Sequence, residues 1–244
     1  MMRDQEAHWN DTFARNEDFF GDDRSDLSTV ALDVFRREGV RSVLELGCGQ
    51  GRDTIFLARN GLHLTALDYS SRAIEDLSSR VQEQGLGSSV ASMTHDVRQP
   101  LPLEDGSVDG CYSHMLLCME LSTRQIASVL REVHRVLRPG GIAIYSVRST
   151  QDSHCGAGLQ RRECMFEVGG FVVHFFNRQK VNELSSGFDI LQVERMQEGS
   201  QPRELLAVTM RRLDRAPTTD FEETALPTEH DVRLPRNLEP RGRT

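Results

Sequence analysis

The sequence has 244 residues, 38% of them hydrophobic, and a formal net charge of −8. That length fits one large domain, or one domain with added segments, and is enough to bury a substantial core. The acidic balance argues against a protein that binds nucleic acid over a broad basic surface. We therefore expect no nucleic-acid partner.

The sequence also bears on where the protein works. No apolar run approaches the roughly 20 residues of a membrane span, and the first residues lack the apolar core of a signal peptide. Five cysteines, an odd number without paired spacing, indicate free thiols in a reducing compartment. These features predict a cytoplasmic protein that is not embedded in a membrane.

The first 39 residues are predicted to be helical. Trp9 and Phe13 are spaced as an i, i+4 pair on one face of an amphipathic helix within residues 5–20. A second helix is expected from Ser25 or Asp26, either of which can cap it, to about Glu38. We interpret residues 1–39 as an N-terminal helical cap; the alternative is that the first helix only packs on the core.

Strands and helices alternate from residue 40 onward. Strands are predicted near 42–46, 63–67, 90–94, 108–113 and 141–147, with helices near 51–60, 71–84 and 122–137. Two further strands are expected near 188–195 and 204–211, separated by a turn at 199–202. This order predicts an α/β fold, a doubly wound sheet that is mostly parallel and carries helices on both faces.

A glycine-rich loop follows the first of these strands. Gly47, Gly49 and Gly51 stand at alternate positions directly before a helix, so the backbone amides of the helix start are open to a ligand. A dinucleotide fingerprint would need its third glycine at position 52, where this sequence has Arg52. Two acids accompany the loop: Glu45 precedes it, and Asp68 follows the next strand at the distance typical of a carboxylate that binds ribose hydroxyls. The ligand should contain a nucleoside.

These residues resemble the class I S-adenosylmethionine-dependent methyltransferases. Motifs similar to those of the family occur in the family's order at 45–51, 67–70, 95–97, 109–114 and 137–141. The loop at 50–58 is similar to that of the small-molecule type, in particular the thiopurine and tellurite-resistance methyltransferases. The resemblance implies a Rossmann-like sheet of seven strands with an antiparallel last strand. It also implies a cofactor-binding domain over residues 40–213.

The resemblance further implies which residues hold S-adenosylmethionine. Asp96 and the amide of Val97 would meet the adenine, and Ser113 would lie near the methionine portion. Trp9 belongs to the cap over the cofactor. The complete predicted set is Trp9, Glu45, Gly47, Cys48, Gly49, Gly51, Arg52, Asp53, Asp68, Tyr69, Ser70, Asp96, Val97 and Ser113.

Residues 149–180 interrupt the sheet pattern and are rich in glycine, histidine and aromatic residues. A long segment of this kind inside a compact domain is typically functional, and we interpret it as a lid over the methyl acceptor. Residues 214–244 are rich in proline and charge, which predicts a disordered or loosely draped tail. The protein is expected to be a monomer or a homodimer.

The predicted activity is methyl transfer to an S, N or O atom of a small molecule by in-line displacement. His114, at the end of a strand beside the methyl group, is the first candidate for a catalytic base, and His154 and His174 in the lid are further candidates. Each of the three has the alternative of a purely structural role. Arg148 and the pair Arg161 and Arg162 are candidates to hold an acidic acceptor.

Two alternatives accompany this prediction. The chain could bind the cofactor or its demethylated product without chemistry. It could also methylate a thiophilic metalloid held by cysteines, of which Cys111, Cys118, Cys155 and Cys164 are the candidates. No Cys-x-x-Cys or Cys-His spacing suggests a metal site, so none is predicted.

Overall fold

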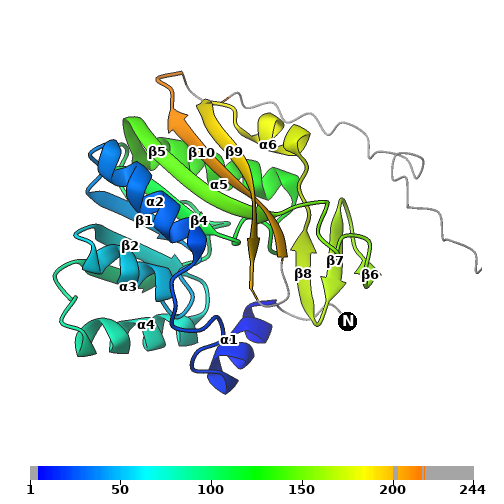
Figure 1. The fold of residues 1–244 in the computed structure, drawn as a ribbon, viewed down its shortest axis with the longest axis horizontal. Helices are drawn as coiled ribbons and strands as arrows, with labels where there is room; N and C mark the ends of the chain where they lie inside the picture. The colour runs from blue at the N-terminus through cyan, green and yellow to red at the C-terminus, as the bar shows by residue number, and fades with distance from the viewer. Residues whose placement is uncertain (1–4, 200–202, 216, 218–244) are drawn as a thin grey trace, which may run out of the picture.

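The computed structural model describes residues 5–199, 203–215 and 217. The tail predicted at 214–244 lies almost entirely outside these residues. Helices and strands follow one another closely along the chain (Figure 1). The helices are α1 (Gln5–Arg15), α2 (Asp26–Arg37), α3 (Arg52–Arg59), α4 (Ser71–Glu83), α5 (Thr123–Val136) and α6 (Arg178–Leu184). The strands are β1 (Ser42–Leu46), β2 (His63–Asp68), β3 (Val90–Thr94), β4 (Val108–His114), β5 (Leu137–Arg148), β6 (Leu159–Gln160), β7 (Met165–Val168), β8 (Phe171–His174), β9 (Phe188–Glu198) and β10 (Arg203–Arg212).

The main sheet has seven strands in the order β3-β2-β1-β4-β5-β10-β9. The first five strands are parallel to one another, and β10 runs antiparallel to both β5 and β9. The predicted fold, a mostly parallel seven-stranded sheet with an antiparallel last strand, is confirmed. Because β1 and β4 are neighbours although β2 and β3 lie between them in sequence, the strand order reverses beside β1, which is where open α/β sheets bind ligands.

Hydrophobic side chains cover both faces of this sheet. One face carries α2, α3 and α4, whose Leu27, Leu57 and Leu77 pack with strand residues such as Val43 and Tyr112. The other face carries α5 and α6, which pack against the side chains that alternate with these. Figure 1 shows α2 and α3 in front of the sheet and α5 behind it.

The N-terminal region divides into two parts. Helix α2 packs by its apolar face, including Leu27, Ala31 and Phe35, in the core of the domain, so it is not a cap. Helix α1 lies below the sheet in Figure 1, away from α2 and close to β8. Its Trp9 and Phe13 form a separate aromatic cluster. Within residues 1–39, a cap therefore stays a prediction for α1 and the loop after it alone.

The insertion at 149–180 is folded. Strands β6, β7 and β8 form a small antiparallel sheet in that order, and α6, which the sequence did not predict, begins within it. Strand β5 begins at Leu137, four residues before the predicted start. Strand β10, which forms a hairpin with β9, also pairs with β5, and its Leu205 lies opposite Arg148 at the end of β5. The hairpin of β9 and β10 therefore extends past the carboxyl ends of the parallel strands.

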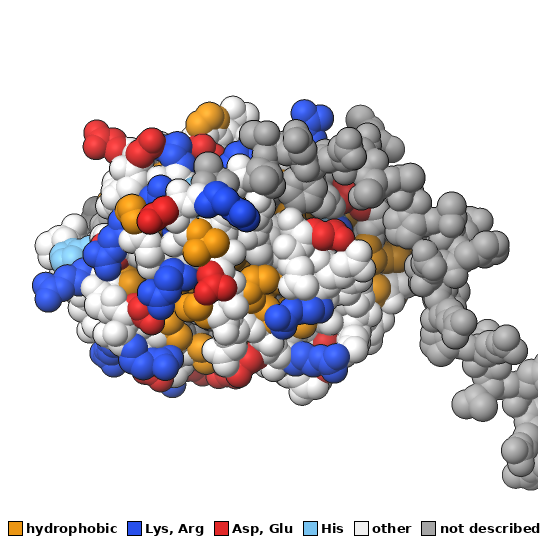
Figure 2. Space-filling view, turned by 90° about the horizontal axis from the view of Figure 1, so that it is seen from above, with side chains coloured by type: hydrophobic (Ala, Val, Ile, Leu, Met, Phe, Trp, Pro, Cys, Tyr) orange, Lys and Arg blue, Asp and Glu red, His pale blue; other side chains and the backbone are white. Residues whose placement is uncertain are grey.

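The surface mixes charges of both signs. In the view from above, basic and acidic side chains are interspersed over the part of the chain that is coloured (Figure 2). Among the helices that the structure describes, none combines the length and the hydropathy of a membrane span.

Gly51 offers a test of the packing behind the glycine loop. Both Gly51 and Gly61 have a φ near +90°, but a Cβ on Gly51 would lie 2.3 Å from Leu77 Cδ1, whereas one on Gly61 would meet nothing within 4 Å. Gly61→Ala should cost roughly 1–2 kcal/mol of unfolding free energy from backbone strain. Gly51→Ala should cost about 1–3 kcal/mol more, because the buried Leu77 must repack. Urea unfolding of both variants measures this, and equal losses would contradict it.

Candidate active site

A cavity of about 530 Å³ opens at the carboxyl edge of the parallel strands. The glycine loop, the ends of β2, β4 and β5, helix α1, strand β8 and the start of β10 contribute to its wall. Its size is within the range of small-molecule sites. Most of the predicted site residues line it: Trp9, Glu45, Gly47, Cys48, Gly49, Gly51, Arg52, Asp53, Asp68, Tyr69, Asp96, Val97, His114 and His154.

The glycine loop is held in a shape that only glycine adopts without strain. Gly47, Gly49 and Gly51 have φ values of +74°, +52° and +89°, in the left-handed region. A Cβ on Gly47 would lie 2.8 Å from Leu116 Cβ. The loop is also fixed by β2, because the amide of Gly47 donates to the carbonyl oxygen of Leu67 at 2.8 Å. The backbone therefore forms a close-fitting wall of the cavity.

Asp68 joins the end of β2 to this loop. Its Oδ2 accepts a hydrogen bond from the Gly49 amide, and its Oδ1 accepts one from the Ser70 amide, both at 2.9 Å. Burial raises the pKa of Asp68, and these hydrogen bonds lower it in part. Each carboxylate oxygen can accept more than one bond, so Asp68 retains acceptor capacity at the cavity wall.

Glu45 is a second buried carboxyl group on the wall. Thr54 donates its hydroxyl to Oε2 at 2.6 Å. Burial, with the charges of Asp53 and Asp68 adding to it, raises the pKa of Glu45 to about 8. Glu45 is therefore largely protonated at neutral pH. A cationic group placed beside it would favour the carboxylate form.

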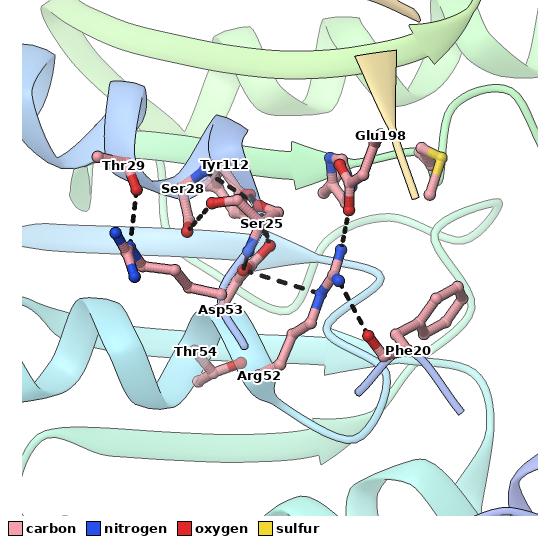
Figure 3. Close-up of polar contacts among 12 residues, drawn as sticks. Phe20, Ser25, Ser28, Thr29, Arg52, Asp53, Thr54, Tyr112 and Glu198 are labelled. Carbon is pink, nitrogen blue, oxygen red and sulfur yellow. Dashed lines mark hydrogen bonds and ion pairs between the residues drawn. The ribbon is translucent and has the colours of Figure 1, made fainter. Parts of the chain in front are cut away.

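Asp53 has a structural task that the sequence did not predict. Its carboxylate accepts hydrogen bonds from the amide and hydroxyl of Ser25 at 2.8 and 2.7 Å, and from the Tyr112 hydroxyl at 2.7 Å. Ser25 is the N-cap of α2. The network, drawn in Figure 3, ties α2, α3 and β4 together behind the cavity wall.

Arg52, next to Asp53, connects the start of α3 to two distant segments. It donates to the carbonyl oxygen of Phe20 at 3.1 Å and to Oε1 of Glu198 at 2.5 Å (Figure 3). Glu198 ends β9, so this pair connects the hairpin of β9 and β10 to the glycine loop. Arg52 therefore helps to close the cavity.

His114 ends β4 on the cavity wall, and both of its ring nitrogens have neighbours. Nδ1 lies 2.8 Å from the Ser146 hydroxyl, and Nε2 lies 2.8 Å from Oε2 of Glu198, an approach that does not meet hydrogen-bond geometry. Burial raises the pKa of Glu198, but His114 and Arg52 outweigh it and lower that pKa to about 2. The next residue, Met115, has a φ of +57°, so the chain turns sharply here.

Arg148 and His154 form a second polar group on the wall. The guanidinium of Arg148 donates to both oxygens of Asp152, at 2.6 and 3.0 Å, and lies 3.2 Å from Nδ1 of His154. This buried pair fixes the start of the insertion against the end of β5.

Helix α1 covers the cavity. Gln5 accepts a hydrogen bond from the Val172 amide at 3.2 Å and donates one to the Gly170 carbonyl at 3.0 Å, which clips α1 to β8. Trp9 lies between Phe13 and Phe171, with ring centroids at 5.3 and 4.7 Å. Helix α1 and the insertion at 149–180 therefore contact each other at the cavity.

Three predicted residues lie elsewhere. Ser70 is buried as the N-cap of α4, and Ser113 is buried with its hydroxyl donating to the Leu46 carbonyl; neither lines the cavity. His174 is fully buried, with Nδ1 2.8 Å from the Leu121 carbonyl and Nε2 against Lys180. Its side chain projects to the side of β8 opposite the wall residue Val173. The predicted catalytic role of His174 is corrected to a structural one.

The sequence matches the family described as methyltransferase domain over residues 43–141. Malonyl-[acyl-carrier protein] O-methyltransferase of Erwinia billingiae is 34% identical over 121 residues, 49% of this chain and 43% of that protein. Thiol S-methyltransferase TMT1B of Homo sapiens is 36% identical over 110 residues, 44% of this chain and 42% of that protein. The chain thus spans less than half the length of these two curated relatives.

A solved structure shares the fold over most of the chain. It is that of Burkholderia thailandensis 1,6-didemethyltoxoflavin-N1-methyltransferase with bound 1,6-didemethyltoxoflavin and S-adenosylhomocysteine. It has a TM-score of 0.68 and 19% identity, and the match covers 86% of this chain and 88% of that one. The chain carries a class I S-adenosylmethionine-dependent methyltransferase domain. The resemblance seen in the sequence and the expected cofactor, S-adenosylmethionine, are confirmed.

Several wall residues of this methyltransferase domain were not predicted. Arg203 lies on the hairpin of β9 and β10, which carries no motif, and Gln5 and Phe171 are brought together by the contact of α1 with β8. Glu198, which contacts the wall residues Arg52 and His114, was not predicted either. The cysteines are free thiols. In the described residues, no three His, Cys, Asp or Glu side chains are arranged to hold a metal ion. The metalloid alternative therefore gains no support.

The corrected role of His174 predicts a pH effect on stability. Burial, together with the charge of Lys180, lowers the pKa of His174 to about 4. In the unfolded chain this imidazole binds a proton near pH 6.5, whereas in the folded chain it binds one only near pH 4. The unfolding free energy therefore falls as the pH falls from about 6.5 to about 4. The unfolding free energy of the wild type should drop by roughly 1–3 kcal/mol more between pH 7 and 4 than that of His174→Asn. If the unfolding free energies of the wild type and His174→Asn depended on pH in the same way, the imidazole of His174 would not be buried in its neutral form.

Proposed function

We propose that this protein transfers the methyl group of S-adenosylmethionine to a small-molecule nucleophile. The observation that carries the proposal is the order of groups along one edge of the sheet. Asp96 follows β3, Asp68 ends β2, the glycine loop follows β1 and His114 ends β4, and all line one cavity. This order supplies sites for an adenine, a ribose and an amino-acid chain in a row, followed by space for an acceptor.

The wall fits the cofactor chemically. Asp68 has acceptor capacity for ribose hydroxyls, and the bare backbone of the glycine loop admits a ligand that a Cβ would exclude. Glu45 can compensate an ammonium group, which would lower its raised pKa. When bound, the cofactor supplies a methyl group on a sulfonium, whose carbon–sulfur bond breaks as the bond to the nucleophile forms.

The residues around the acceptor contribute positioning and exclusion of water. Trp9 and Phe171 cover the cavity, and Gln5 holds this cover in place. Nδ1 of His114 lies within hydrogen-bond distance of the Ser146 hydroxyl, and Nε2 faces Oε2 of Glu198 without forming a hydrogen bond. We therefore propose that His114 orients the acceptor side of the wall, and that the nucleophile reacts as a neutral amine or as a thiolate or oxyanion. The acceptor-lid role of residues 149–180 and a cytoplasmic location remain part of the proposal.

Asp68 should govern cofactor affinity. Asp68→Asn removes the charge that ribose hydroxyls would bind and should weaken S-adenosylhomocysteine by about 10- to 100-fold in calorimetry. Asp109→Asn is a matched control. Oδ2 of Asp109 also accepts two backbone amides, those of Arg41 and Ser42 at 2.9 and 3.0 Å, but Asp109 is the second residue of β4 and lies at the opposite end of this strand from His114. The control should bind like the wild type. If Asp68→Asn bound S-adenosylhomocysteine as tightly as the wild type, the cofactor would have to bind in another pocket.

Turnover separates an enzyme from a module that only binds. A panel of thiols, amines, phenols and carboxylates should be incubated with S-adenosylmethionine, and formation of S-adenosylhomocysteine followed. We expect at least one class to react, at a rate that falls at subsaturating cofactor in Asp68→Asn but not in Asp109→Asn. Tight cofactor binding without turnover on any class would favour the non-catalytic alternative.

A further inference from the structure

The cavity wall carries two guanidinium groups that form no hydrogen bond or ion pair within the described residues. Arg203 begins β10, and Arg162 lies in the turn between β6 and β7; both line the cavity. We propose that the methyl acceptor is an anionic small molecule, bearing a carboxylate or a phosphate, and that Arg203 and Arg162 bind this group. The inference rests on the proposed function and names its substrate class.

The nearest carboxylates are already engaged. Asp152 accepts two hydrogen bonds from Arg148, one from the His154 amide and one from the Glu204 amide. Glu198, the cross-strand neighbour of Arg203, has one oxygen on Arg52 and the other against His114. Neither acid forms a hydrogen bond or an ion pair with the Arg203 guanidinium, although Oε2 of Glu198 accepts no hydrogen bond and the charges of both acids act to raise the pKa of Arg203.

The guanidinium groups of Arg203 and Arg162 form no hydrogen bond or ion pair with any residue in the described ranges. The Arg203 side chain is half-buried, and its burial, together with the positive charge of Arg148, lowers its pKa. A guanidinium nevertheless remains protonated at neutral pH. A cation that is partly stripped of water beside other cations is stabilised by an incoming anion, and two guanidinium groups can each bind a carboxylate or phosphate through paired hydrogen bonds.

The position of Arg203 assigns it to the acceptor rather than to the cofactor. The predicted cofactor groups follow β3, β2 and β1, and the reactive methyl belongs near His114 on β4. Strand β10 lies two strands beyond β4, on the far side of β5, which is roughly 10 Å. An anion held there would be on the opposite side of His114 from the glycine loop.

A binding experiment tests the site without turnover. The protein saturated with S-adenosylhomocysteine should be titrated by calorimetry with sodium benzoate and with inorganic phosphate, at constant ionic strength. We expect millimolar or tighter binding of at least one, and the preferred ion tells a carboxylate acceptor from a phosphate acceptor. Arg203→Gln and Arg162→Gln should each weaken that binding by about 10- to 100-fold. Arg195→Gln, an exposed arginine of the same hairpin that is not on the wall, is the matched control.

A kinetic experiment tests the substrate class. Matched acceptors should be compared, such as thiosalicylate with thiophenol and 4-hydroxybenzoate with phenol. The member that carries the carboxylate should have a kcat/KM at least 10-fold higher, and Arg203→Gln should remove this advantage through KM with little change in kcat. For thiophenol, and likewise for phenol, kcat/KM should be the same in the wild type and in Arg203→Gln.

The outcomes separate the inference from the proposed function. If thiophenol and phenol react as well as their carboxylate-bearing counterparts, or if neither benzoate nor phosphate binds, the anionic acceptor is wrong while methyl transfer stands. If Arg203→Gln weakens S-adenosylhomocysteine as strongly as it weakens the anion, the arginine serves the cofactor carboxylate and the inference is overturned. If no acceptor reacts but the anion binds and depends on Arg203, the anion site stands and the proposed activity fails.

Discussion

The site depends on one carboxylate that holds two strands together at their carboxyl ends. Asp68 accepts the amides of Gly49 and Ser70, and so connects the glycine loop after β1 to the start of α4 after β2. A buried carboxylate is costly unless it is hydrogen-bonded, and here the two amides offset part of that cost. The same group faces the cavity, so the interaction that shapes the loop also presents an acceptor for ribose hydroxyls.

Closure of the cavity comes from segments that are remote in sequence. Gln50 accepts the Phe19 amide at 3.1 Å and donates to the Asn16 carbonyl at 2.9 Å, which holds the loop after α1 against the glycine loop. On the other side, Glu198 of the closing hairpin reaches Arg52 and His114. A site built in this way can exclude water from a methyl transfer without a dedicated general base.

The sequence was most informative where local pattern determines structure. The run from Val43 to Gly51 predicts strand, loop and helix start, because apolar periodicity and glycine spacing are local signals, and Asp68 follows from the next strand end. Glu198 and Arg203 could not be predicted, since the place of Arg203 on the wall, and of Glu198 against Arg52 and His114, depends on the register of β10 against β5 and β9. The error at His174 has a related cause: side chains alternate between the two faces of a strand, and the sequence did not tell which face of β8 meets the cavity. Ser70 and Ser113 were carried over by motif, but their hydroxyls cap a helix and bridge two strands.

The arrangement of charge along the sheet edge also gives the site a direction. Acidic wall residues lie at the carboxyl ends of β1, β2 and β3: Glu45, Asp68 and Asp96, the last paired with Arg98 at 2.7 Å. Arginine side chains lie on the wall at the end of β5 and the start of β10. A ligand with hydroxyls and an ammonium group suits the first half, and an anion suits the second. Neither half follows from the overall charge of −8.

The central claim is that Asp68 and the glycine loop together hold the ribose of S-adenosylmethionine. A crystal structure of the complex with S-adenosylhomocysteine tests it most directly. The account predicts both ribose hydroxyls within hydrogen-bond distance of Asp68, with the Gly49 amide still donating to the same carboxylate. An adenosine bound elsewhere, or a ribose that does not touch Asp68, would contradict it.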